Sequence, residues 1–138
     1  AGASFSNLKL EISNYGLTNN IIFEPWTNDL ASYYKTADLF LLTSNYEGYG
    51  RTIIEALAVG LLVVSTDVGI ASEYINNASG LVVPVGDKEA LVNASLKIMR
   101  RKQQGNLVAT KIVIKDMLVY DEYLRLYKES LEKLMLKE

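Results

Sequence analysis

Two glutamates, two glycines and an arginine stand close together in residues 47–55, within the segment 44–60 whose sequence is SNYEGYGRTIIEALAVG. Gly48 and Gly50 would let the backbone approach a ligand closely. The N–H groups at the start of the helix that follows favour an anion, and Arg51 would add a cation for a phosphate. This segment therefore predicts a site for a phosphate and a polyhydroxyl ligand.

The two glutamates, Glu47 and Glu55, are suited to sugar or ribose hydroxyls because an ionised carboxylate only accepts hydrogen bonds. Glu47 lies in the loop, whereas Glu55 lies in the second turn of the helix beside an apolar stripe. A carboxylate in that position is costly unless it has partners. The alternative for Glu55 is a solvated side chain that pairs with a lysine or arginine. The segment lacks the lysine of a P-loop and the G-x-G-x-x-G pattern, so it does not indicate a Walker NTPase.

The composition narrows the chemistry further. The chain has 138 residues, a net charge of -2, no histidine and no cysteine. Imidazole catalysis, disulfides and thiolate metal sites are therefore excluded within this chain, and we expect neither a metal nor a cofactor. The mixed charges do not predict nucleic acid as a partner, and the absence of cysteine fits a cytoplasmic protein.

Short apolar runs alternate with helical patterns, which is typical of a parallel sheet covered by helices. The segments predicted as strands are 20–24, 38–43, 61–66 and 81–84, and those predicted as helices are 8–15, 29–37, 51–59, 72–76, 88–101 and 121–137. Residues 106–117 allow a helix or a strand, and helix is preferred. The predicted fold is one α/β domain over residues 1–138, a Rossmann-like parallel sheet with helices on both faces, incomplete at its start.

Several local expectations follow from the pattern. Strand 38–43 is apolar enough to be buried on both sides. Gly16 follows the first helix where a C-terminal glycine belongs, and Asp87 caps the helix that runs to about residue 101. Asp67 and Glu73 flank Gly69, and two alternatives are open there: these carboxylates reach the ligand crevice, or Asp67 or Ser72 caps the short helix after the third strand.

Ligands of such sheets bind at the carboxyl ends of the strands. The loops expected at that edge are 25–27, 44–50, 67–69 and 85–87, each of which also reads as an ordinary turn. Trp26 is interpreted as the edge of the core rather than as a platform for a base. Tyr49 either packs on a ligand ring or fills the loop, and Glu73 is interpreted as part of its helix rather than of the site.

The pattern Glu-Gly-Tyr-Gly-x4-Glu-Ala-x-Ala-x-Gly resembles the signature of the retaining glycosyltransferases of family 4, in the C-terminal half of the GT-B fold. Residues 37–44, 63–69 and 80–91 are similar to three further blocks of that family. The resemblance covers about residues 8–101 and the final tyrosine-rich helix.

The resemblance implies a role for each matching residue. Glu47 would contact hydroxyls of the donor sugar and is the candidate catalytic residue, and Glu55 would hold the nucleotide ribose. The remaining expected donor-binding residues are Gly48, Tyr49, Gly50, Arg51 and Thr52. Members of the family transfer a sugar from a nucleotide-sugar with retention, usually without a catalytic metal.

The chain also departs from the family. Leu62 replaces a proline, and Ile70 replaces a glycine, which is expected to narrow the crevice. The acceptor-binding N-terminal domain and the start of the C-terminal domain have no counterpart here. We therefore expect part of a cytoplasmic enzyme whose partners are a nucleotide-sugar and the missing acceptor domain. Peripheral membrane association through that domain, and self-association of the fragment, are part of the same expectation.

Two rival hypotheses remain open from the sequence. One is a non-catalytic nucleotide-sugar binding module that a partner chain completes. The other is a structural domain whose site has decayed. Ligand titration would separate the decayed site from the other two.

Overall fold

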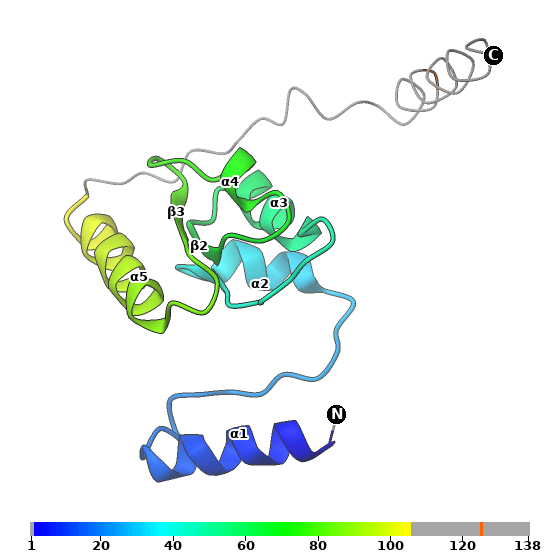
Figure 1. Cartoon of the computed structure of the whole chain (residues 1–138), viewed down its shortest axis with the longest axis vertical. Helices are drawn as coiled ribbons and strands as arrows, with labels where there is room; N and C mark the ends of the chain where they lie inside the picture. The colour runs from blue at the N-terminus through cyan, green and yellow to red at the C-terminus, as the bar shows by residue number, and fades with distance from the viewer. Residues whose placement is uncertain (1, 106–124, 126–138) are drawn as a thin grey trace. The chain divides into compact units, whose positions relative to one another are not determined.

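The computed structural model describes residues 2–105 and 125, which divide between two compact units, residues 1–30 and 31–138 (Figure 1). Each unit is described by itself. The sequence interpretations for residues 106–117 and 121–137 lie outside the described residues, apart from Arg125. Within the described part, no helix is both long and apolar enough to cross a bilayer.

The first unit contains helix α1 (Gly2–Asn14) and an irregular segment after it. Gly16 has a φ of 67° and follows the helix as predicted. The strand predicted at 20–24 is wrong, because the described residues offer this segment no hydrogen-bonded partner strand. Phe23 instead packs its ring edge-on against Phe5, with 5.0 Å between the ring centroids.

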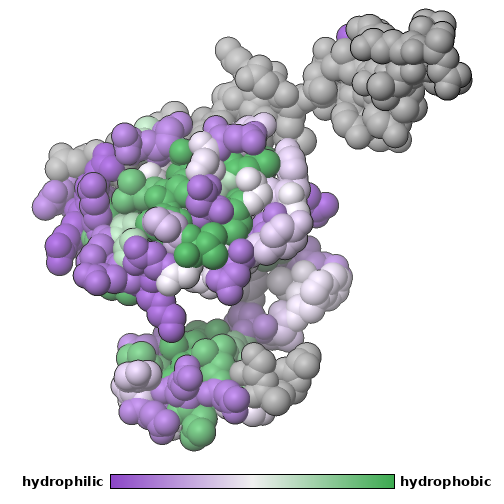
Figure 2. All heavy atoms as spheres, in the orientation of Figure 1, coloured by the Kyte–Doolittle hydropathy of each residue, from purple (hydrophilic) through white to green (hydrophobic). Residues whose placement is uncertain are grey.

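The first unit also leaves much of its apolar surface open (green in the lower part of Figure 2). Trp26 is 84% exposed, so its interpretation as a core edge is wrong. Because residues 20–24 form no strand, the indole of Trp26 does not belong to a core built on a sheet.

The second unit is built on an open parallel sheet. Its strands, in the spatial order β1-β2-β3, are β1 (Phe40–Leu42), β2 (Val63–Thr66) and β3 (Gly80–Val83). Its helices are α2 (Leu30–Thr36), α3 (Arg51–Ala58), α4 (Ala71–Tyr74) and α5 (Lys88–Gln103). From α2 to α5 helices and strands alternate, as the sequence predicts.

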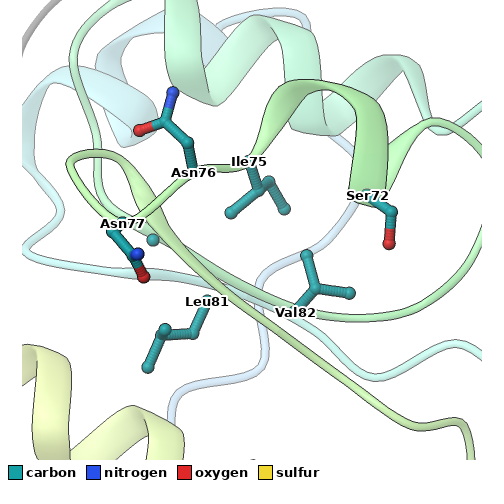
Figure 3. Close-up of a pocket in the computed structure, with 7 residues that line it drawn as sticks. Ser72, Ile75, Asn76, Asn77, Leu81 and Val82 are labelled. Carbon is teal, nitrogen blue, oxygen red and sulfur yellow. The ribbon is translucent and has the colours of Figure 1, made fainter.

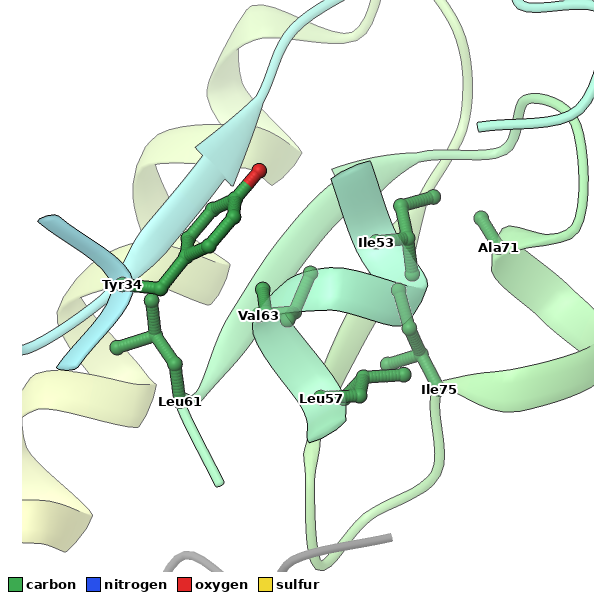
Figure 4. Close-up of a cluster of buried hydrophobic side chains, with 8 residues drawn as sticks. Tyr34, Ile53, Leu57, Leu61, Val63, Ala71 and Ile75 are labelled. Atoms are coloured by element: carbon green, nitrogen blue, oxygen red, sulfur yellow. The ribbon is translucent and has the colours of Figure 1, made fainter. Parts of the chain in front are cut away.

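Helices cover both faces of this sheet. On one face Val63 packs with side chains from α2, α3 and α4 (Figure 4), and on the other Leu62 and Val64 pack against α5. The α/β architecture with helices on both faces is therefore confirmed. Of the three described strands, β2 is buried throughout. The prediction that the strand before the glycine-rich loop is buried on both sides is wrong, because β1 stands at an edge of the described sheet and Leu41 is 45% exposed.

The predicted caps have different outcomes. The backbone N–H of Ala90 donates to Asp87 Oδ1 at 2.8 Å, which confirms Asp87 as the cap of α5. The alternative that Asp67 or Ser72 caps α4 is wrong, because its N-cap is Ile70, without a side-chain cap. Ser72 instead donates its hydroxyl to Asp67 Oδ1 at 2.6 Å.

Tyr34 of α2 belongs to the core and yet carries a polar tip. It is 7% exposed, and its ring stands edge-on to Phe40 at 5.7 Å. In Figure 4 the hydroxyl lies at the end of the ring away from Leu61. The hydroxyl donates to Glu55 Oε2 at 3.2 Å. Burial, with the hydrogen bond and charge of Glu55, raises the pKa of Tyr34 from 10.0 to about 12.

Gly80 is required by close contact between β2 and β3. A Cβ atom at this position would overlap the carbonyl group of Val63 on the paired strand and would lie 3.1 Å from Cγ2 of Ile75. We predict that Gly80→Ala lowers the free energy of unfolding by at least about 2 kcal/mol, since backbone cannot move aside cheaply. Urea unfolding measures this. Gly48→Ala, where the added atom meets nothing within 4 Å, is the control. Equal effects of the two substitutions would contradict the prediction.

The raised pKa of Tyr34 predicts a pH dependence of stability. The native protein keeps the proton up to about pH 12, whereas the unfolded chain loses it near 10.0. The stability that Tyr34 contributes is therefore fully present below pH 10 and is lost as the pH rises toward 12. The difference in unfolding free energy between the protein and Tyr34→Phe should shrink over that window. Urea titrations from about pH 8 to about pH 12 measure it, with Tyr15→Phe as the control. A difference that stays constant across the window would count against this contact.

Candidate functional site

The loop after β1 turns into α3 through a glycine in a conformation that other residues rarely adopt. Gly50 is the N-cap of α3, with φ 84° and ψ 43°, and its carbonyl accepts from the N–H of Ile53 at 2.9 Å. A side chain at this position would be strained and would meet Ile53 at 3.2 Å. The glycine therefore sets the direction in which α3 leaves the loop.

Two hydrogen bonds fasten this loop to the end of β2. The hydroxyl of Thr66, which is buried, donates to the carbonyl of Ser44 at 2.6 Å. The N–H of Ile70 donates to the carbonyl of Tyr49 at 3.0 Å. A Cβ at Gly69 would overlap that same carbonyl, so the two loops touch through backbone. The structure thus brings together two of the loops expected at the carboxyl edge.

The other two expected loops are placed differently. Residues 85–87 follow the carboxyl end of β3 and lead into α5. Residues 25–27 belong to the first unit, which is described by itself.

Glu47 is held by a hydroxyl from its own loop. Ser44 donates its side-chain hydroxyl to Glu47 Oε1 at 2.7 Å, and both residues are half-buried. Because Thr66 fixes the backbone of Ser44, a chain of two hydrogen bonds links the end of β2 to this carboxylate.

Glu55 has two partners among the described residues. Arg51 donates through Nε to Oε1 at 2.8 Å, and Tyr34 donates to Oε2 at 3.2 Å. The side chain of Glu55 is 32% exposed, so a ligand can still reach it. The pairing of Glu55 with an arginine, which is the alternative from the sequence, is therefore present. It is one of two contacts, since Tyr34 makes the other.

The remaining predicted residues lie around the same turn. Arg51 is 85% exposed and holds Glu55 through one nitrogen, while a guanidinium carries four further N–H donors. Thr52 is half-buried in the first turn of α3, and Gly48 is exposed. The ring of Tyr49 is half exposed, and it is the carbonyl of this residue that joins the neighbouring loop. Ile70 is buried, with its side chain 3.8 Å from the position of a Cβ on Gly50.

Three residues of this arrangement were not found by sequence reasoning. Ser44 stands three positions before Glu47, a spacing that permits a local hydrogen bond. Tyr34 and Thr66 are distant in sequence from the residues they hold. From the sequence, each is simply part of a predicted helix or strand. Only the packing of α2 and β2 against α3 and its loop reveals them.

A separate hollow of about 370 Å³ lies beside β3 and α4 (Figure 3). It is lined by Ser72, Ile75, Asn76, Asn77, Gly80, Leu81 and Val82. None of the residues expected to bind a donor lines it. Within the described residues, no group of three or more acidic, histidine or cysteine side chains could hold a metal ion.

The comparisons with known proteins agree on one family. Residues 1–110 match the family described as glycosyl transferases group 1. The lipopolysaccharide core biosynthesis mannosyltransferase LpsB of Rhizobium meliloti (strain 1021) is 36% identical over 97 residues, which are 68% of this chain and 28% of that protein. The D-inositol 3-phosphate glycosyltransferase of Paenarthrobacter aurescens (strain TC1) is 32% identical over 117 residues, which are 80% of this chain and 29% of that protein.

Two solved structures share the fold. Sucrose-phosphate synthase from Thermosynechococcus elongatus gives a TM-score of 0.78 at 23% identity, covering 99% of this chain and 35% of that one. The pneumococcal O-GlcNAc transferase GtfA, in complex with UDP and GlcNAc, gives 0.68 at 23% identity, covering 94% of this chain and 27% of that one. The described sheet is thus part of a GT-B fold, and the chain spans about a third or less of the proteins it matches. The chain belongs to the group 1 glycosyl transferases.

Proposed function

We propose that this chain carries most of the donor site of a retaining, family 4 glycosyltransferase. The reaction would move a hexose from a nucleotide-sugar to a glycan or lipid-linked acceptor. The observation that carries the proposal is the pair of carboxylates at one end of the sheet. Glu47 and Glu55 each have an oxygen held by a hydroxyl of the chain, and both stand beside the start of α3.

Glu55 is proposed to hold the ribose of the nucleotide. Its carboxylate is partly exposed, its orientation is set by Arg51 and Tyr34, and it lies one turn inside α3. A carboxylate with free acceptor sites is well suited to two neighbouring hydroxyl groups, since each hydroxyl donates one proton.

Glu47 is proposed to meet the hydroxyls of the donor sugar. It lies earlier in the same loop, and Ser44 fixes one of its oxygens. The contact is proposed to tighten in the transition state, because only such contacts lower the barrier of the transfer step.

The diphosphate is proposed to lie at the start of α3. The backbone N–H groups there carry the positive end of the helix dipole, and Gly48, Tyr49 and Gly50 bring the backbone close. Arg51 and Thr52 would add charge and a hydroxyl. We propose no metal for this site, since N–H groups and guanidinium nitrogens can meet the phosphate charge.

Transfer also requires an acceptor held against the donor with water excluded. We propose that a further domain supplies this wall of the site and any peripheral contact with a membrane, and that the reaction takes place in the cytoplasm. The chain by itself is then expected to bind donor without transferring sugar.

Substitution of Glu55 tests the proposal. We predict that Glu55→Gln weakens binding of a nucleoside diphosphate by about 1–3 kcal/mol, because a hydrogen-bonded charge is lost. Calorimetric titration with UDP, GDP and ADP measures the affinity. Glu89→Gln, an exposed change in the first turn of α5, is the matched control. Unchanged affinity in Glu55→Gln, or no binding of any of the three to the unaltered chain, would refute the proposed donor site.

A different outcome is expected for Glu47. We predict that Glu47→Gln weakens binding of a nucleotide-sugar by about 1–3 kcal/mol and leaves the matching nucleoside diphosphate unaffected, since only the former carries the sugar. UDP-glucose, GDP-mannose and ADP-glucose are titrated beside their diphosphates. An equal loss for both kinds of ligand would show that Glu47 shapes the loop instead.

A further inference from the structure

Tyr34 is a buried tyrosine whose hydroxyl reaches a proposed ligand-binding carboxylate. The residue lies on α2, 21 positions before Glu55, and in the sequence it is separate from the loop that forms the site. Its ring is fixed between the core and Phe40, and its hydroxyl donates to Glu55 Oε2 at 3.2 Å. Packing of the core alone does not need a hydroxyl here, because phenylalanine would fill the same space.

We propose that Tyr34 is a positioning residue that orients Glu55 and thereby gives the site its preference for ribose over 2′-deoxyribose. The proposal rests on the proposed role of Glu55 toward the nucleotide. It adds a residue outside the glycine-rich segment, on another helix, to the determinants of specificity.

Of the two groups that hold Glu55, Tyr34 is the more fixed. Arg51 is 85% exposed and pairs with Glu55 at a spacing of four residues on one helix. Such exposed pairs contribute only a few tenths of a kcal/mol, because two long side chains must give up freedom in water. Tyr34 is 7% exposed and loses little further freedom on making its bond. The tyrosine therefore decides the direction in which the carboxylate points.

The two hydrogen bonds leave acceptor positions on the Glu55 carboxylate that match two neighbouring hydroxyl groups. Its two oxygens offer about four lone-pair sites. Arg51 takes one on Oε1 and Tyr34 takes one on Oε2, so each oxygen keeps a site open. Two open sites, one on each oxygen, suit the vicinal 2′- and 3′-hydroxyls of ribose. A 2′-deoxyribose can use only one of them and gains less from a fixed carboxylate.

The test compares ribonucleotides with deoxyribonucleotides in Tyr34→Phe, which keeps the ring and loses the donor. UDP, GDP and ADP and their 2′-deoxy forms are titrated calorimetrically, and the pair whose ribonucleotide binds best is analysed. We expect affinity for the ribonucleotide to fall about three- to tenfold, which corresponds to one hydrogen-bonded contact. Affinity for the deoxy form should change by less than about twofold. The ratio of the two affinities should therefore fall, whereas Tyr33→Phe, on the same helix, should leave it unchanged.

A merely structural tyrosine would give another result. Loss of both affinities by the same factor, or of neither, would overturn the positioning role and leave the proposed function standing. If the unaltered chain binds no nucleotide, or binds both forms equally, the proposed role of Glu55 fails and the inference fails with it. Phe40→Leu is the second variant, for use if Tyr34→Phe does not fold. It keeps the hydroxyl but removes its ring partner, so the ratio should fall again, and an unchanged ratio would overturn the inference.

Discussion

The candidate site depends on how the end of β2 holds the loop that follows β1. The hydroxyl of Thr66 donates to the carbonyl of Ser44. In the loop that follows β2, the N–H of Ile70 donates to the carbonyl of Tyr49. Gly69 permits this approach because it has no side chain. β2 in turn is buried on both faces by the two hydrophobic clusters. The position of the loop thus depends on the most enclosed of the described strands and on the residues that directly follow it.

The sequence predicts well those features that repeat or that obey local rules. The alternation of helices and strands, the glycine after α1 and the Asp87 cap all follow from short-range patterns, and the structure confirms them. The predicted strand at 20–24 is wrong because a strand needs a partner, and no pattern within the segment supplies one. The burial predicted for β1 is wrong for the same reason, since the strand's neighbours decide whether Leu41 is covered.

The site shows the same division. Residues 47–55 stand out from sequence because glycines, a carboxylate and a helix start occur together, and the structure places them at one turn. What the sequence does not contain is the orientation of each carboxylate. Ser44 orients Glu47 from within the loop, but Tyr34 reaches Glu55 from another helix. A contact between residues so far apart in sequence depends on how the helices pack. The sequence of one segment therefore cannot predict it.

The two partners of Glu55 respond differently to salt. Arg51 is charged and exposed, and mobile ions screen charges in water over about 8 Å at physiological ionic strength. Tyr34 is neutral and lies in the core, where ions do not reach it. As ionic strength rises, the pull of the guanidinium on the carboxylate weakens while the phenolic contact persists. In the proposed site these two residues would therefore have separate tasks. Attraction of an anionic ligand by Arg51 would depend on ionic strength, whereas the orientation of Glu55 by Tyr34 would not.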